Sequence, residues 1–170
     1  MGNKNTLYAW ALFLPRGVRL INTHEYTPPA MSISKTTFKT GAMDAPVSLD
    51  DGMEELTCSF KIYGYSTEIL SLYGMTTSVT SPIVTARQVY RDGRGFTGQV
   101  ETLQGMITSI TPDARPNTSK SDAALQVEMS LEYYQSVYNG VERICIIPDE
   151  FVRRINGVNV LEAAKTLLRV

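Results

Sequence analysis

The sequence has little of what enzymes and metalloproteins use for chemistry. It has 170 residues, with one histidine, His24, and two cysteines, Cys58 and Cys145. The cysteines lack metal-site spacing, and two cysteines do not make a disulfide framework. No Ser-His-acid or Cys-His pair is close in sequence, although such groups can meet in space. His24 stands near two prolines and is interpreted as a loop residue rather than a catalyst. We therefore expect no enzyme activity, no cofactor and no metal.

An excess of positive charge is also missing. The chain has 16 Lys and Arg against 17 Asp and Glu, a net charge of −1. Phosphate binding needs a basic face that releases counterions, so stable nucleic-acid binding is not expected. Brief passage of nucleic acid past the protein is compatible with this composition.

Long hydrophobic runs are absent, and no segment is long enough to span a bilayer as a helix. The run LYAWALFLP, residues 7–15, lacks a convincing cleavage site and is interpreted as part of a first strand, not a signal peptide. We therefore expect synthesis in the cytoplasm and no membrane insertion by the monomer. With 43% hydrophobic residues, residues 1–170 are expected to fold as one domain.

Two segments alternate between apolar and polar residues, which is typical of strands with one buried and one hydrated face. In residues 54–63 the apolar positions are Leu56, Cys58, Phe60 and Ile62, and the polar ones are Glu55, Thr57, Ser59 and Lys61. In residues 124–134 the apolar positions are Leu125, Val127, Met129, Leu131 and Tyr133, and the polar ones are Gln126, Glu128, Ser130 and Glu132. The hydrated faces fit three interpretations: open solvent, a subunit interface, or the wall of a channel.

Most of the remaining chain also favours β structure. Asp92-Gly93 and Asn139-Gly140 are hairpin signals. Gly98 and Gly105 indicate a bulge, a bend or a close backbone approach. Strands are expected at residues 6–14, 31–40, 82–90, 96–110 and 142–147, with a possible partner strand at 18–21.

Helical patterns are few. Residues 66–74 predict a short helix, with Ser66 as N-cap and Gly74 at its end. Residues 149–170 are interpreted as a helical tail broken at Asn156-Gly157.

Two long loops are expected between these elements. Residues 41–52 form a polar-tipped excursion, in which Asp50 and Asp51 are assigned to the start of a turn because calcium-loop spacing is missing. Residues 112–122 form a polar loop that is expected to be mobile.

Two segments each combine several motifs in a fixed order. In GAMDAPVSLDDGMEELTCSFKIYGYSTEILSLYG, residues 41–74, a Gly-x-Met-Asp-Ala-Pro-Val turn leads into an alternating strand, a Gly-Tyr pair and a short helix. The closing stretch has a hairpin, an acidic-apolar strand and then INGVNVLEAAKTLL, residues 155–168. In these motifs the chain resembles the major tail tube protein of contractile-tailed bacteriophages and of R-type pyocins. Order and spacing agree over residues 30–170, and the first 30 residues match less clearly.

The resemblance implies a structural subunit of the inner tube of a contractile tail. Its fold would be mainly β, an antiparallel β-sandwich or half-barrel with one short flanking helix and a helical C-terminal tail. Hexameric rings would share one continuous β-barrel and stack into a hollow tube. Implied partners are further copies of the chain, the tail sheath protein, a baseplate or tube initiator, a tail terminator and a tape measure protein. The tube would belong to the virion tail, assemble in the host cytoplasm, and let DNA pass.

This family places the two hydrated faces in the lumen. The predicted lumen-facing residues are Glu55, Thr57, Ser59, Lys61, Gln126, Glu128, Ser130 and Glu132. They carry three glutamates against one lysine, a net of −2 per subunit, which would repel phosphate and let DNA slide. An alternative is that one of the two faces lies on the sheath side. The excursion is expected to contact the neighbouring ring through Met43, Asp44, Val47, Leu49, Asp50 and Asp51.

The competing hypothesis is a monomeric β-barrel module that binds a small ligand or a partner protein. The third possibility is an enzyme, but no sequence motif supports it. Rings or tubes at high concentration favour the tube subunit, and a persistent monomer favours the binding module.

Overall fold

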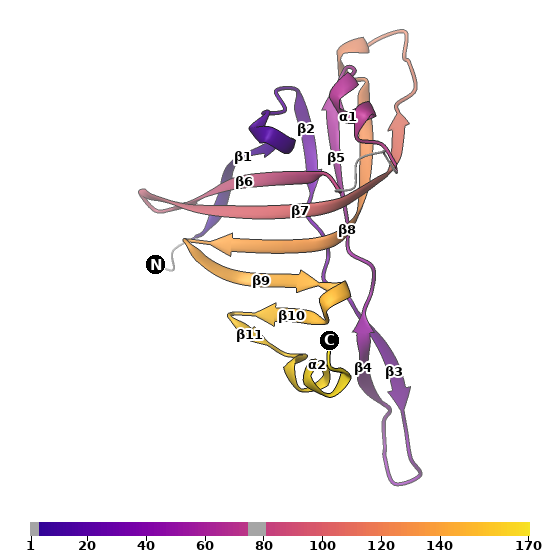
Figure 1. The fold of residues 1–170 in the computed structure, drawn as a ribbon. Coiled ribbons are helices and arrows are strands. Elements are labelled where there is room, and N and C mark those ends of the chain that lie inside the picture. Colours follow the sequence, from indigo (N-terminus) through magenta and orange to yellow (C-terminus); the bar gives the residue numbers. More distant parts are fainter. Residues whose placement is uncertain (1–3, 75–80) are drawn as a thin grey trace.

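The computed structural model describes residues 4–74 and 81–170. These residues form a nine-stranded antiparallel sheet with the order β1-β6-β7-β8-β9-β10-β11, in which β5 pairs with β8 and β2 pairs with β5 (Figure 1). The strands of this sheet are β1 (Thr6–Phe13), β2 (Thr23–Thr27), β5 (Thr57–Tyr63), β6 (Ile83–Asp92), β7 (Gly95–Pro112), β8 (Ala124–Tyr138), β9 (Val141–Ile147), β10 (Val152–Ile155) and β11 (Val158–Asn159). The mainly β, antiparallel fold predicted from the sequence is confirmed.

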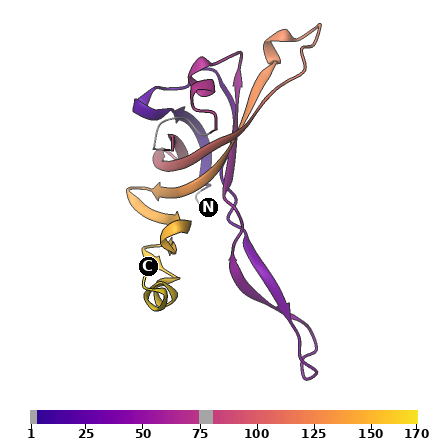
Figure 2. The same ribbon diagram turned by 45° about the vertical axis from the view of Figure 1, so that its right-hand side comes forward.

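A second sheet of two strands, β3 (Ile33–Phe38) and β4 (Val47–Met53), projects from the body as an arm (Figure 2). Helical elements are short: η1 (Pro15–Gly17), α1 (Thr67–Ser71), η2 (Lys120–Asp122), η3 (Pro148–Glu150) and α2 (Glu162–Leu168). Among the described residues, none of these helices has the length and hydrophobicity needed to cross a membrane.

The long strands β7 and β8 belong to both halves of the main sheet. One end of β8 pairs with β5, and the other end pairs with β9. Between them lies a bulge, because Leu131 is opposite Gly105 and Tyr133 is opposite Gln104, which leaves Glu132 as the extra residue. Figure 1 shows both strands turning in this region. A bulge bends a strand and increases its twist, so it accounts for the turn.

Gly105 allows β7 and β8 to approach at this bulge. A Cβ atom at this position would lie 1.9 Å from the carbonyl oxygen of Ser130 and 2.8 Å from the Cα of Leu131. The predicted close approach at Gly105 is therefore confirmed. Gly98 instead lies in regular register opposite Val89, and its Cβ would meet no described atom within 4 Å.

The alternating segments bury the faces that the sequence predicts, with one exception. Leu56, Cys58, Phe60 and Ile62 are 2–3% exposed, and Val127 and Met129 are fully buried. The prediction is wrong at Tyr133, which is partly exposed, while Tyr134 is 4% exposed. The extra residue Glu132 shifts the alternation by one position and causes this difference.

One carboxylate lies inside the core. Glu101 of β7 is 1% exposed. Its side chain accepts hydrogen bonds from the Tyr134 hydroxyl at 2.8 Å, from the Tyr26 hydroxyl at 3.4 Å, and from the side-chain amide of Gln88. Burial raises the pKa of Glu101, and these three donors act in the opposite direction. The network links β2, β6, β7 and β8 through polar side chains rather than apolar contact.

The C-terminal tail differs from the prediction. Residues 152–155 form β10, which pairs with β9, and Asn156-Gly157 is the turn to β11. Asn156 and Gly157 both have positive φ angles, as a tight hairpin turn requires. Pairing with β9 satisfies the backbone groups that a helix would have paired internally. Within residues 149–170, the only α-helix is Glu162–Leu168.

Three further expectations change at the N-terminal side. Residues 47–53 are a strand rather than part of an open loop. Residues 18–21 form no strand, although Arg19 makes an isolated bridge to Phe13. His24 lies in β2, which the sequence did not predict, and its Nδ1 is 2.6 Å from the Tyr63 hydroxyl. The two prolines that follow β2 obscured this strand.

Candidate functional site

The polar residues of β5 and β8 lie side by side on one face of the sheet. Directly opposed residues of antiparallel strands point to the same side. The sequence predicted each hydrated face separately, and the strand pairing joins them. The opposed pairs are Thr57 with Ser130, Ser59 with Glu128, and Lys61 with Gln126.

Glu55 and Glu132 extend this polar face toward the bulge. Glu55 precedes β5 and accepts a hydrogen bond from the Ser130 hydroxyl. Glu132 is the extra residue of the bulge, and its side chain is exposed. All eight predicted residues are thus placed in one region, and their assignment to a lumen stays a prediction.

The polar face continues onto the flanking strands. On β2, Glu25 is opposite Lys61, and the two side chains form an ion pair of 3.8 Å. Such an exposed pair contributes about 0–1 kcal/mol, so it matters more for the surface charge than for stability. On β7, Ser109 is opposite Glu128. Four strands, in the order β2-β5-β8-β7, therefore carry one hydrated face.

Both sides of this four-stranded segment are free edges in the part of the chain that the structure describes. Among the described strands, β2 pairs with β5 alone. β6 stops pairing with β7 at Gln104, and beyond it Ile107 makes an isolated bridge to Tyr73. Residues 108–112 of β7 thus have β8 on one side and no described strand on the other. Unpaired N–H and C=O groups on such edges invite another strand.

The arm has one apolar and one polar face. Phe38 is opposite Val47, and Thr36 is opposite Leu49. The side chains of Phe38, Val47 and Leu49 are 53%, 49% and 52% exposed. A two-stranded hairpin is marginally stable in water, and contiguous exposed apolar groups indicate an interaction surface.

The predicted inter-ring residues are all in this arm. Val47, Leu49, Asp50 and Asp51 lie in β4, whereas Met43 and Asp44 lie in the turn between β3 and β4. Which molecule they contact stays a prediction.

Asp50 fixes the base of the arm to the body. Its carboxylate accepts a hydrogen bond from the Gly52 N–H at 2.9 Å and forms an ion pair with Arg153 of β10, also at 2.9 Å. The Gly52 bond, followed by Arg153, lowers the pKa of Asp50. No group of three or more possible metal ligands occurs within the described ranges.

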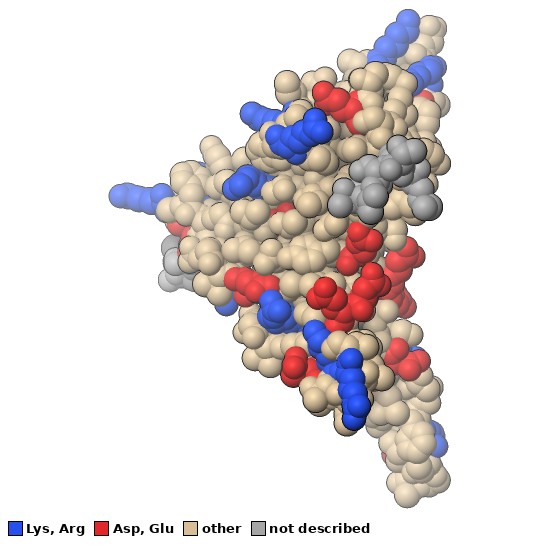
Figure 3. Space-filling view, in the orientation of Figure 1, with Lys and Arg blue, Asp and Glu red and all other residues tan. Residues whose placement is uncertain are grey.

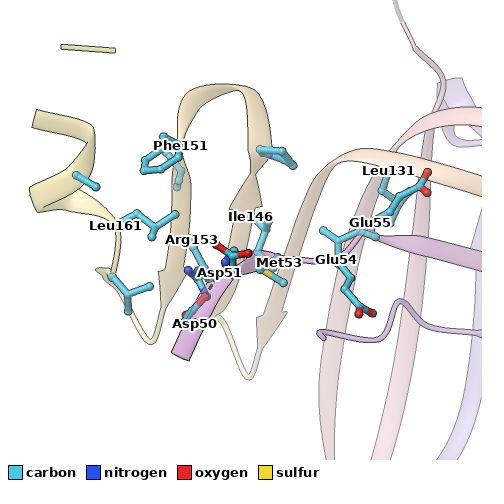
Figure 4. Close-up of a pocket in the computed structure, with 16 residues that line it drawn as sticks. Asp50, Asp51, Met53, Glu54, Glu55, Leu131, Ile146, Phe151, Arg153 and Leu161 are labelled. Atoms are coloured by element: carbon cyan, nitrogen blue, oxygen red, sulfur yellow. Dashed lines mark hydrogen bonds and ion pairs between the residues drawn. The ribbon is translucent and has the colours of Figure 1, made fainter. Parts of the chain in front are cut away.

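A groove lies between the base of the arm and the C-terminal strands and helix (Figure 4). We call it the C-terminal groove. The sequence does not predict this groove, because its walls come from segments far apart in the chain and have no local pattern. Its apolar lining includes Met53, Leu56, Leu131, Ile146, Phe151, Val152, Val160 and Leu161, and its acidic residues are Asp50, Asp51, Glu54 and Glu55.

Comparison with known proteins gives a family and a shared fold. The family model described as phage tail tube protein FII matches residues 4–168. Among solved structures, this chain is similar to a chain of the PVC sheath-tube complex of an extracellular contractile injection system in its extended state, with a TM-score of 0.59 and 10% identity over 76% of this chain and 88% of that chain. At this identity the likeness shows the fold alone. Comparison with individually curated proteins gives no match.

The family match covers nearly the whole chain, including the N-terminal residues that resembled the family less clearly. The fold is shared with the matched chain of the sheath-tube complex. The resemblance that rested on residues 41–74 and on the closing stretch is confirmed by these two findings. This chain therefore belongs to the phage tail tube protein FII family, and it is a structural subunit of a tail tube.

Proposed function

We propose that six copies of the chain close into a ring and that such rings stack into a hollow tube. The two free edges beside the polar face carry this proposal. If the edge of β7 in one subunit pairs with β2 of the next, ring closure removes both of these free edges. Four strands from each of six subunits give a barrel of about 24 strands, and barrels of about 16 strands already enclose an aqueous channel.

The role we propose is mechanical, without catalysis. The tail sheath protein is the proposed outer partner, because the solved structure with this fold is a sheath-tube complex. Head-to-tail stacking does not close on itself, so other proteins must start and stop the tube. A baseplate or tube initiator, a tail terminator and a tape measure protein fill these roles, with assembly in the host cytoplasm.

The arm is the proposed contact between rings, and shortening it tests both the ring and the stack. We expect the wild-type chain to form tubes as its concentration rises, measured by size-exclusion chromatography and negative-stain microscopy. Replacing residues 39–46 by an Asn-Gly turn should leave single rings and an unchanged circular dichroism spectrum. The shortened arm lacks its tip, while the ring edges stay intact.

Two outcomes would contradict these assignments separately. Normal tubes from the shortened variant would show that the arm tip does not join rings. A wild-type chain that stays monomeric at the highest concentration would instead favour the monomeric binding module.

The polar face is the proposed lumen wall, with DNA passing along it. Glu128→Lys with Glu132→Lys changes the net charge of the eight predicted residues from −2 to +2, since each reversal adds two charges. We expect tubes to form normally and to retain short duplex DNA at low salt, because a basic wall holds phosphate by counterion release. DNA retention by purified tubes across a salt series measures this.

The matched control for this variant is Glu128→Gln with Glu132→Gln, which removes the negative charges without adding positive ones. It should assemble normally and retain less DNA than the lysine variant. If the lysine variant fails to form rings while the glutamine variant assembles, these residues lie in a subunit interface and not in the lumen.

A further inference from the structure

We propose that adjacent rings are also joined by a second contact, in which the turn at residues 15–21 of one subunit inserts into the C-terminal groove of another. We call this turn the knob. The inference rests on the proposed stacking of rings. Figures 1 and 2 show η1, within the knob, and α2, beside the groove, at opposite ends of the body and on the same side of it. A head-to-tail contact between identical copies requires two different surfaces at opposite ends.

The knob is held in a fixed shape by its backbone. The Leu14 N–H donates to the Val18 carbonyl at 2.7 Å, and the Gly17 N–H donates to the Leu14 carbonyl at 3.1 Å. The Leu20 N–H donates to the Leu12 carbonyl at 3.0 Å. Leu14 and Leu20 are 5% and 7% exposed, so they anchor both ends of the knob in the core. A preorganised turn loses little conformational freedom when it binds.

The tip of the knob presents apolar and basic side chains. Val18 is 43% exposed and Ile21 is 83% exposed. Arg16 and Arg19 are also exposed. An isoleucine with four-fifths of its surface in water on a rigid turn gains by burial against an apolar surface, at about 25 cal/mol for each Å² that is covered.

The C-terminal groove has the complementary character. Its floor is apolar, with Phe151 and Leu161 on the side of the C-terminal strands and helix and Met53 at the base of the arm (Figure 4). Its acidic residues include Asp51 and Glu54, both exposed. Figure 3 shows acidic side chains gathered where the arm joins the body. When one subunit carries basic groups and the other carries acidic groups around an apolar contact, the charges fix the register of the contact and speed the association of the two subunits.

A second copy fits this groove better than a small molecule does. Every subunit offers both surfaces, so one contact repeats along the whole tube. The arm begins at the groove and projects beyond the body (Figure 2). A copy seated in the groove therefore lies beside the arm, which makes the knob contact continuous with the proposed arm contact.

Disulfide cross-linking in assembled tubes tests the proposal. The variant carries Ile21→Cys and Val160→Cys, one in the knob and one in the groove. The native Cys58 and Cys145 are both 3% exposed and should stay unreactive. We expect mild oxidation to produce a ladder of linked subunits in tubes and to leave dilute monomers unlinked. The control variant pairs Val160→Cys with Phe96→Cys, an exposed site on the β6–β7 hairpin.

The proposal is overturned if tubes form and the knob–groove pair cross-links no more than the control pair. If neither the wild type nor any variant forms tubes at any concentration, the stacking proposal itself fails. These two failures are distinguishable by microscopy before oxidation.

A charge variant gives an independent test. Arg16→Glu with Arg19→Glu should lose tube formation at low salt, and adding Asp51→Lys with Glu54→Lys in the same chain should restore it. Arg91→Glu with Arg94→Glu makes the same charge change on the β6–β7 hairpin and should assemble normally. Equal assembly of the knob variant and this control would overturn the proposed contact, provided that circular dichroism shows both to be folded.

Discussion

Replacing Gly105 with alanine is expected to lower the free energy of unfolding by about 3 kcal/mol. The new Cβ atom would lie 1.9 Å from the carbonyl oxygen of Ser130 and 2.8 Å from the Cα of Leu131. Both are backbone atoms, so no side chain can rotate away to make room. β7 and β8 would have to separate at the bulge, where they also pass between the two halves of the sheet. Urea unfolding of the dilute monomer, followed by the fluorescence of its single tryptophan, Trp10, measures the loss.

Gly98→Ala is the matched control in the same strand. Its Cβ would meet no described atom within 4 Å, and it lies in regular register. We expect a gain of about 0.5 kcal/mol, because alanine restricts the unfolded chain more than glycine does. Similar unfolding midpoints for the two variants would contradict the close approach of β7 and β8 at Gly105.

The effect of Gly105→Ala should extend from folding to assembly. Gly105 lies where β7 stops pairing with β6, shortly before the free edge at residues 108–112. A shift of β7 at this residue changes the position of the edge that we propose pairs with the next subunit. Folded Gly105→Ala protein should therefore form rings less readily than the Gly98→Ala control at equal concentration.

Local patterns in the sequence predicted the strands that bury one face against the subunit's own core. The alternation in β5 and in the first half of β8 reflects burial against the subunit's own core, so it could be read residue by residue. It failed at Tyr133, because the bulge at Glu132 depends on Gly105 in another strand. No feature next to Tyr133 reports that distant partner.

The arm and the C-terminal groove were harder to predict for a related reason. Phe38 and Val47 pair with each other and are about half exposed, so the pattern of core burial that marks the strands of the main sheet does not apply to them. The groove walls come from β4, β8, β9, β10 and α2, and only the fold brings them together. A surface that is proposed to bind another molecule has only a weak hydrophobic pattern in the sequence of a single chain.

The hydrogen-bond network of Glu101 inside the core could not be predicted from the local sequence either, because its partners lie on other strands. Removing this side chain is expected to destabilise the fold strongly. Glu101→Ala is expected to lower the free energy of unfolding by about 4 kcal/mol, because it leaves buried and partly buried donors without an acceptor. These donors are the hydroxyls of Tyr26 and Tyr134 and the side-chain amide of Gln88. The same urea and Trp10 fluorescence measurement applies. A loss no larger than that of an exposed substitution such as Glu162→Ala would contradict the role of this network.

Stability should also depend on pH through Glu101. Burial raises the pKa of this carboxyl above its ordinary value, so the folded state holds the proton more tightly than the unfolded chain. The stabilisation from this group is complete below the unfolded pKa and is lost as pH rises through the folded pKa. The nearby Tyr26 and Tyr134 stay neutral in this range, because burial raises the pKa of both, and burial raises the pKa of Cys58 to about 12.

Glu101→Gln separates this effect from the titration of other carboxyls. The amide keeps an acceptor oxygen and nearly the same shape, but it does not titrate. We expect the wild type to lose stability relative to Glu101→Gln as the pH rises above the ordinary pKa of a glutamate. Urea midpoints of both proteins across this range give the difference directly. A constant difference would show that the three donors hold Glu101 ionised throughout, and that their hydrogen bonds outweigh the effect of burial.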